Sequence, residues 1–166
     1  MVNCRTYTQK DNQFLREMLF EAVFWSRTEN NRPSLEEGLS YDYTKHVLID
    51  FGKRKGDIAV IVEIDGEKAG AAFIRYWNDE VNLRGYISED IPVLVIAVAK
   101  AYRRQGVGSV LLEMLKRVAE ENDILKISLC VTKNNVAYQL YANHEFKIVE
   151  EIDSSYNMLW KGEREK

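Results

Sequence analysis

The chain has 166 residues, of which 46% are hydrophobic and 30% are charged, and its formal net charge is −3 at pH 7. These values are typical of a folded domain with a hydrophobic core, and we expect one domain over residues 1–166. The negative charge argues against a nucleic-acid-binding protein that depends on a basic surface, because phosphate backbones attract positive charge.

Cysteine content and apolar runs argue against further classes. Cys4 and Cys130 are too few for a disulfide framework, and no four ligands stand at metal-like spacing, so we expect no metal. The first ten residues contain no apolar leader, and the longest apolar run, Val93–Ala99, is too short to span a membrane. We therefore expect a cytoplasmic protein that binds neither membranes nor nucleic acid.

The first 50 residues favour helices. Asp11 is a candidate cap for a helix in which apolar residues recur at helical spacing as far as Val23. A capping-box spacing predicts a short helix after Ser34. We expect another helix over residues 41–50.

The rest of the chain alternates strands and helices. Runs rich in β-branched and apolar residues predict strands at 58–64, 69–77, 93–98, 126–132, 146–152 and 156–161. Strong 3.6-residue periodicity predicts a helix over 107–121, and a shorter helix is expected over 134–143. The order of these elements predicts a mixed α/β domain.

The stretch "YRRQGVGS" (102–109) joins the strand at 93–98 to the helix at 107–121. The first amides of a helix have no intrahelical partner and carry partial positive charge. Gly106 and Gly108 allow close backbone approach, while Arg103 and Arg104 add full charges. A strand, a glycine turn and a helix in this order predict a phosphate or pyrophosphate site.

Three other interpretations of this turn compete. A Walker loop requires a lysine before its final Ser or Thr, and Gly108-Ser109 has none. A Rossmann fingerprint requires a third glycine where Leu111 stands. The remaining alternative is a solvated turn that binds no ligand.

Two motifs together decide between these interpretations. Arg-x-x-Gly-x-Gly at 103–108 is followed by Asn-x-x-Ala-x-x-Leu-Tyr-x-x-x-x-Phe at 134–146. The pair resembles the GNAT superfamily of acyl-CoA-dependent N-acyltransferases, and the similarity extends more loosely over most of the chain. The resemblance implies a mixed, mostly antiparallel twisted sheet flanked by helices, in which the two central parallel strands splay apart.

The resemblance also implies a site for acetyl-CoA as co-substrate. Turn amides would bind the pyrophosphate, the preceding strand would pair with the pantetheine arm, and the second motif would contact that arm. The implied cofactor-binding residues are Ile96, Ala97, Val98, Arg103, Arg104, Gln105, Gly106, Val107, Gly108, Ser109, Asn134, Ala137 and Tyr141.

Catalytic roles follow from the same resemblance. Tyr141 matches the family's tyrosine near the thioester sulfur and is the expected general acid, because phenol and thiol have similar proton affinities. Asn134, Ala137 and Tyr141 are spaced to share one helix face. The subgroup often has a glutamate where Val93 stands, so we take Glu89 as the candidate base. The alternative for Tyr141 is a purely structural role as a packed core residue. The alternative for Glu89 is a solvated surface carboxylate without a catalytic role.

The amine acceptor is not named by any motif. Trp25, Tyr41, Arg75 and Trp77 are candidate acceptor-site residues, although aromatic side chains in these positions also suit a core. We expect an acetyl-CoA-dependent N-acetyltransferase acting on a small-molecule or peptide amine, as a monomer or homodimer. The alternatives are a non-catalytic acyl-CoA sensor and a Rossmann-type nucleotide-binding domain.

Overall fold

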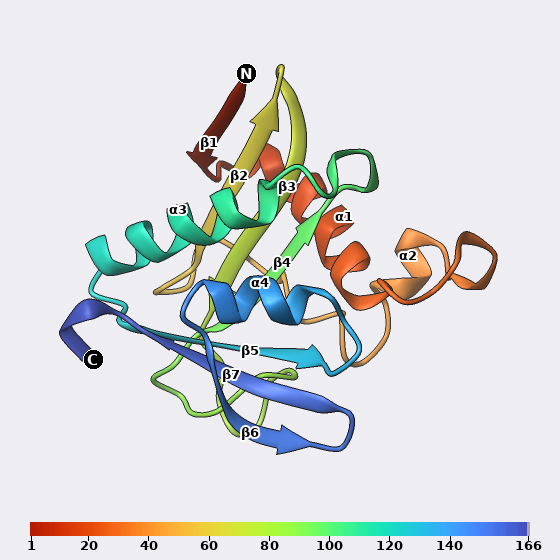
Figure 1. The fold of residues 1–166 in the computed structure, drawn as a ribbon. Helices are drawn as coiled ribbons and strands as arrows, with labels where there is room; N and C mark the ends of the chain where they lie inside the picture. Colours follow the sequence, from red (N-terminus) through yellow and green to blue (C-terminus); the bar gives the residue numbers. More distant parts are fainter. Residues whose placement is uncertain (166) are drawn as a thin grey trace.

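The computed structural model describes residues 1–165. One seven-stranded sheet has the order β1-β2-β3-β4-β5-β7-β6 (Figure 1). The strands are β1 (Val2–Thr6), β2 (Ile58–Ile64), β3 (Glu67–Arg75), β4 (Val93–Val98), β5 (Lys126–Thr132), β6 (Lys147–Ile152) and β7 (Ser155–Lys161). All neighbouring strands are antiparallel except β4 and β5, which are parallel. The sheet is therefore mixed and mostly antiparallel, as the sequence predicts.

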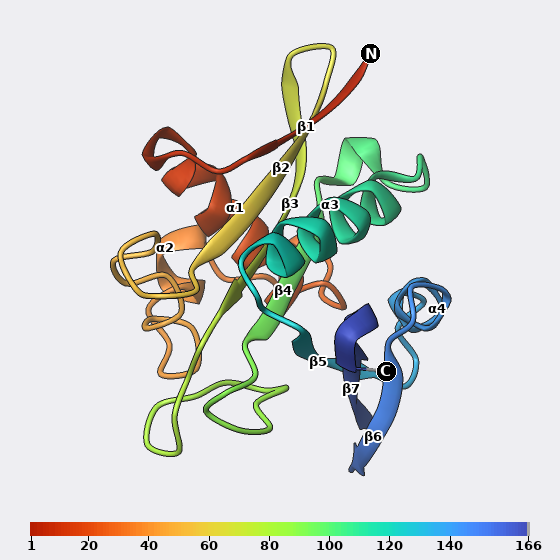
Figure 2. The same cartoon turned by 90° about the vertical axis from the view of Figure 1, so that its left-hand side faces the viewer.

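Helices cover both faces of the sheet. They are α1 (Asn12–Val23), α2 (Leu35–Gly38), α3 (Val107–Glu121) and α4 (Ala137–Asn143). Figure 2 shows α1 and α2 on one side of the sheet and α3 and α4 on the other. Each side has its own buried cluster, and β4 contributes to both because successive side chains of a strand point to opposite faces. Leu94 packs on the α3 side and Val93 on the α1 side.

Three strands have the bounds predicted from the sequence: β2, β4 and β5. The helix predicted over 107–121 is also confirmed as α3, whose buried face includes Leu111, Leu112 and Leu115. These elements agree because long apolar runs or strict periodicity specify one buried face.

One expectation about the first half of the chain was wrong, and one strand there was not predicted. Residues 41–50 form successive turns instead of a helix, and side-chain hydrogen bonds tie these turns to neighbouring segments. The buried hydroxyl of Thr44 donates to the carbonyl of Gly38 at 2.7 Å, and Arg75 donates to that of Val47 at 3.1 Å. Strand β1 was not predicted, since it is short and polar and its order comes from pairing with β2.

Candidate active site

The sheet opens between β4 and β5. Among the described residues, Val93 and Ser128 form the one register pair of these strands, supported by a 3.0 Å bond from the Ser128 amide to the Pro92 carbonyl. On its other side β4 pairs with β3 over its whole length. Figure 1 shows β4 and β5 diverging beyond the Val93 end. Residues 95–98 are consequently half-buried although they lie mid-sheet, and their edge on the β5 side is open to an extended ligand except at the Val98 carbonyl, which accepts a bond from Arg103.

Two buried hydroxyls lie on the β5 side of this opening. Ser128 Oγ and Thr132 Oγ1 have no hydrogen-bond partner within residues 1–165. Their neighbours Ile127, Leu129 and Val131 belong to the α3-side core, so the alternation of the strand turns Ser128 and Thr132 toward the α1 side. Buried polar groups in proteins are nearly always satisfied. These hydroxyls are therefore candidate contacts for a bound molecule, and nothing in the sequence identified them.

The turn after β4 has the geometry of an anion site. Arg104 and Gly106 have positive φ angles of 64° and 81°. The first turn of α3 closes with a 3.2 Å bond from the Val110 amide to the Gly106 carbonyl, so the amides of residues 107–109 precede the helical ladder. Left-handed residues next to a helix start gather amides into a concave nest that attracts anions.

The two arginines of the turn do different things. Arg103 donates to the carbonyl of Val98 at 3.0 Å and to Glu21 of α1 at 3.0 Å, which ties the turn to both β4 and α1. Arg104 is exposed and forms no ion pair within the described part of the chain. Arg104 is therefore the cation that the turn leaves available, whereas Arg103 fixes the position of the turn.

Tyr141 lies on α4 and is 8% exposed. Its ring packs edge-on against Phe146 with 6.1 Å between centroids, and it belongs to the core cluster on the α3 side. Desolvation by burial raises the pKa of the Tyr141 phenol well above its ordinary value. The hydroxyl thus keeps its proton at any physiological pH.

The helix expected over residues 134–143 of the second motif is shorter in the structure. Helix α4 begins at Ala137, so Asn134 lies in the preceding turn and does not share a helix face with Tyr141. Asn134 is exposed, and its neighbour Asn135 accepts a 2.9 Å bond from the Ala137 amide. Asn135 therefore caps the start of α4 with its side chain.

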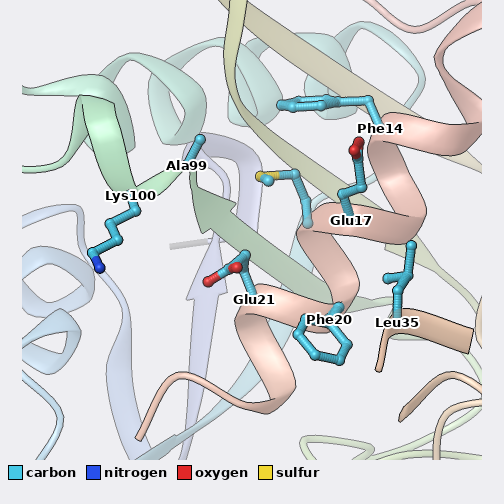
Figure 3. A pocket seen from close by; sticks show the side chains of 8 residues that line it. Phe14, Glu17, Phe20, Glu21, Leu35, Ala99 and Lys100 are labelled. Carbon is cyan, nitrogen blue, oxygen red and sulfur yellow. The ribbon is translucent and has the colours of Figure 1, made fainter. Parts of the chain in front are cut away.

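A pocket of about 360 Å³ lies on the α1 side, next to the end of β4. It is lined by Phe14, Glu17, Met18, Phe20, Glu21, Leu35, Ala99 and Lys100. Figure 3 shows Glu17 and Glu21 on α1, with Lys100 across from Glu21. The lining combines an apolar floor with two carboxylates, and Glu21 is the residue that also binds Arg103. The sequence analysis singled out none of these lining residues.

The predicted acceptor residues fall into two separate groups. Trp25 and Tyr41 lie near the end of α1, where the Tyr41 ring is 6.3 Å from that of Phe24. Arg75 is 1% exposed and is held by Asp57 through two 2.9 Å bonds, while Trp77 is 5% exposed.

The arrangement of Arg75 is that of a structural ion pair. Asp57, itself buried, also accepts bonds from the amides of Gly52 and Arg54, so it connects β3 to the turns of residues 43–57. Glu89, the candidate base, is exposed in the loop before β4, beside Tyr86.

Residues 1–165 offer neither a metal cluster nor a membrane-spanning helix. Residues 1–165 contain no group of three or more His, Cys, Asp or Glu side chains that could hold a metal ion. Within the same residues, none of the helices has the length and apolar character needed to cross a bilayer.

Comparisons with known proteins agree with this geometry. The family model described as "Acetyltransferase (GNAT) family" matches residues 14–146. PaiA N-acetyltransferase of Thermoplasma acidophilum, solved in complex with coenzyme A, is 19% identical with a TM-score of 0.71, and 97% of this chain and 99% of that chain align.

Two further structures have the same fold. Ribosomal-protein-alanine N-acetyltransferase of Brucella melitensis is 19% identical with a TM-score of 0.68 over 96% of this chain and 99% of that chain. YncA of Salmonella typhimurium, a putative acetyltransferase solved with its cofactor acetyl-CoA, is 16% identical with a TM-score of 0.66 over 96% and 93%. The match to the family model covers most of the sequence and includes both motifs, and the chain therefore belongs to the acetyltransferase (GNAT) family.

Proposed function

We propose that the protein is an N-acetyltransferase that moves the acetyl group of acetyl-CoA directly onto a primary amine. The observation that carries this proposal is the free edge of β4 at residues 95–98, which leads straight to the anion-binding turn at residues 103–109. A pantetheine arm is peptide-like and ends in a pyrophosphate. Its hydrogen-bonding groups suit an open strand edge, and its charge suits a helix N-terminus.

Acetyl-CoA supplies the activated acetyl thioester. The backbone of Ile96, Ala97 and Val98 would hold the arm, and the turn from Arg104 to Ser109 would hold the pyrophosphate, with Arg103 holding the turn itself. An amide of β4 facing the thioester carbonyl would stabilise the negative charge that develops on its oxygen. Asn134, in the turn before α4, and Ala137, the first residue of α4, would contact the pantetheine arm.

Tyr141 is the proposed general acid for the departing thiolate. Burial raises its pKa, so the phenol is fully protonated when the thiolate forms. The same apolar surroundings raise the proton affinity of the leaving sulfur, because desolvation disfavours both anions. Transfer from oxygen to sulfur thus stays feasible in a site where free phenol and thiol already have similar pKa values.

Glu89 is the proposed base that takes a proton from the acceptor's ammonium group, so that the neutral amine can attack the thioester carbonyl, and its place in the loop directly before β4 supports this role. The acceptor itself is proposed to be a cationic amine with an apolar carbon skeleton. The pocket beside α1 supports this class, since the exposed carboxylate of Glu17 lines it together with Phe14 and Phe20, whereas Glu21 is already paired with Arg32 and Arg103.

A non-catalytic acyl-CoA-binding module is the second candidate. Val93 favours this candidate. The subgroup of acetyltransferases that the chain resembles often has a glutamate at this position, whereas Val93 is apolar and 1% exposed. The two candidates differ in one observable, the release of free thiol from acetyl-CoA when an amine is added.

The first experiment is thermal denaturation with acetyl-CoA, coenzyme A or NADH. A ligand at a hundred times its dissociation constant adds about 2.7 kcal/mol to the apparent stability of the native state. We expect stabilisation by acetyl-CoA and coenzyme A but not by NADH, followed by thiol release with members of an amine panel. Absence of stabilisation by millimolar acetyl-CoA would refute both candidates, and stabilisation without thiol release for any amine would favour the binding module.

A further inference from the structure

His144 connects the end of α4 to the first turns of α3. Its Nε2 lies 3.1 Å from Ser109 Oγ, and its Nδ1 lies 2.8 Å from Glu113 Oε1. Ser109 belongs to the anion-binding turn and Glu113 lies one helical turn further along α3. The His144 side chain is 13% exposed and that of Glu113 is 66% exposed, so the hydrogen bonds run from a solvent-facing carboxylate through a largely buried imidazole to Ser109.

Close packing fixes this arrangement. A Cβ at Gly108 would come within 2.8 Å of Leu140 Cδ2, which shows how closely α4 approaches the start of α3. The charged groups around His144 are Glu113 and Lys116 from α3 and Glu145 from its own turn. Lys116 donates to the His144 carbonyl at 3.1 Å and pairs with Glu145 at 3.8 Å, so its charge is occupied elsewhere.

The hydrogen-bonding roles follow from the chemistry of the three groups. An ionised carboxylate only accepts, so His144 Nδ1 carries a proton toward Glu113. When His144 is neutral, Nε2 must accept a hydrogen bond, and the Ser109 hydroxyl then donates its hydrogen to the imidazole. In protonated His144, Nε2 donates to Ser109 Oγ, and the hydroxyl proton is free to point at an anion in the turn.

We propose that His144 is a positioning residue that couples proton uptake to acyl-CoA binding through the hydroxyl of Ser109. The inference rests on the proposed function, because the anion concerned is the pyrophosphate of the acyl donor. Binding linkage is reciprocal, so a proton on His144 strengthens donor binding by the same factor by which the donor favours the proton. Glu113 accepts the hydrogen bond from Nδ1 in either protonation state.

The test measures the dissociation constant of 3′-dephospho-CoA at pH 6 and pH 8 by isothermal titration calorimetry. This probe keeps the pyrophosphate but lacks the phosphate monoester, which would itself titrate near pH 6. The variants are His144→Gln and Ser109→Ala. His46→Gln is the matched control, because His46 is the second of the chain's two histidines and contacts Asn82 and Trp77 instead.

We expect the unmodified protein and His46→Gln to bind the probe at least about fivefold more tightly at pH 6 than at pH 8, the low end of usual coupling factors. His144→Gln and Ser109→Ala should show less than about twofold difference, which a purely structural role of His144 would not produce.

Two failures are distinguishable. If the unmodified protein binds neither 3′-dephospho-CoA nor acetyl-CoA, both the proposed function and this inference are wrong. If it binds the probe with the same pH dependence as His144→Gln, the proposed function stands and the coupling through Ser109 is wrong.

Discussion

Gly106 offers the sharpest test of the anion-binding turn, because the chain contains a matched control. Gly106 and Gly66 have nearly equal positive φ angles, 81° and 85°, and at both a Cβ would meet no atom within 4 Å. Gly66 lies in the hairpin between β2 and β3, on the other side of β4 from the opening. Alanine at either position therefore creates the same backbone strain without a steric clash.

The strain can be given a magnitude. A left-handed conformation costs an L-residue about 1 kcal/mol more than glycine. In a domain of this size, that cost lowers the melting temperature by about 2–4 °C. Gly106→Ala and Gly66→Ala should thus lose similar stability in thermal denaturation without ligand.

Ligand binding should separate the two variants. A methyl group at Gly106 stands where an anion would approach the amides of residues 107–109, and weakening one hydrogen bond to a charged group costs about 1.5–3 kcal/mol. We expect calorimetry to show a dissociation constant for coenzyme A raised by about 10–100-fold in Gly106→Ala and unchanged in Gly66→Ala. Equal affinity in both variants, with equal loss of stability, would show that the turn does not hold the pyrophosphate.

Three further perturbations test the site and the framework around it. Tyr141→Phe should lower kcat at least about tenfold in the thiol-release assay while changing the dissociation constant of acetyl-CoA little, and unchanged kcat would remove the general acid. Asp57→Asn leaves the guanidinium of Arg75 buried without its carboxylate, so urea unfolding should show a loss of about 3–5 kcal/mol. Hydrogen bonding to Arg5 lowers the pKa of Asp11, so this carboxylate stabilises the fold above the ordinary pKa near 4 and its contribution is lost as pH falls below it. Asp11→Asn should flatten that acid-side loss in a pH series of melting temperatures, and an unchanged slope would argue against the pairing.

The sequence predicts elements well where one pattern dominates. Strand β2 is a run of β-branched residues and α3 repeats apolar residues on one face, and both have the expected bounds. Residues 41–50 lack a decisive pattern. Their turns are held by contacts with distant groups, such as the bond between Arg75 and the carbonyl of Val47, and no local propensity reports such contacts.

The candidate site likewise has one part that the sequence predicts and another part that depends on tertiary contacts. The turn at 103–109 is predictable because its chemistry depends on neighbouring residues in one short segment. The bond between Arg103 and Glu21 joins residues 82 positions apart, and Arg75 meets its partner Asp57 only once β3 has folded against the turns. The same charged side chain suits a substrate pocket or a buried ion pair, and only tertiary contacts distinguish the two.

The opening beside β4 links the stability of the fold to its chemistry. A central strand with a free edge leaves backbone groups without sheet partners, and a free edge also invites pairing with other chains. Here the free edge is short, residues 95–98, and it lies in the middle of the sheet rather than at its border. The fold thus tolerates one unsatisfied edge where a ligand can complete it, and the unpartnered hydroxyls of Ser128 and Thr132 lie along the facing strand. A donor that completes the edge should therefore stabilise the protein most strongly in this half of the sheet, where hydrogen exchange of β4 and β5 amides would slow more than that of β2.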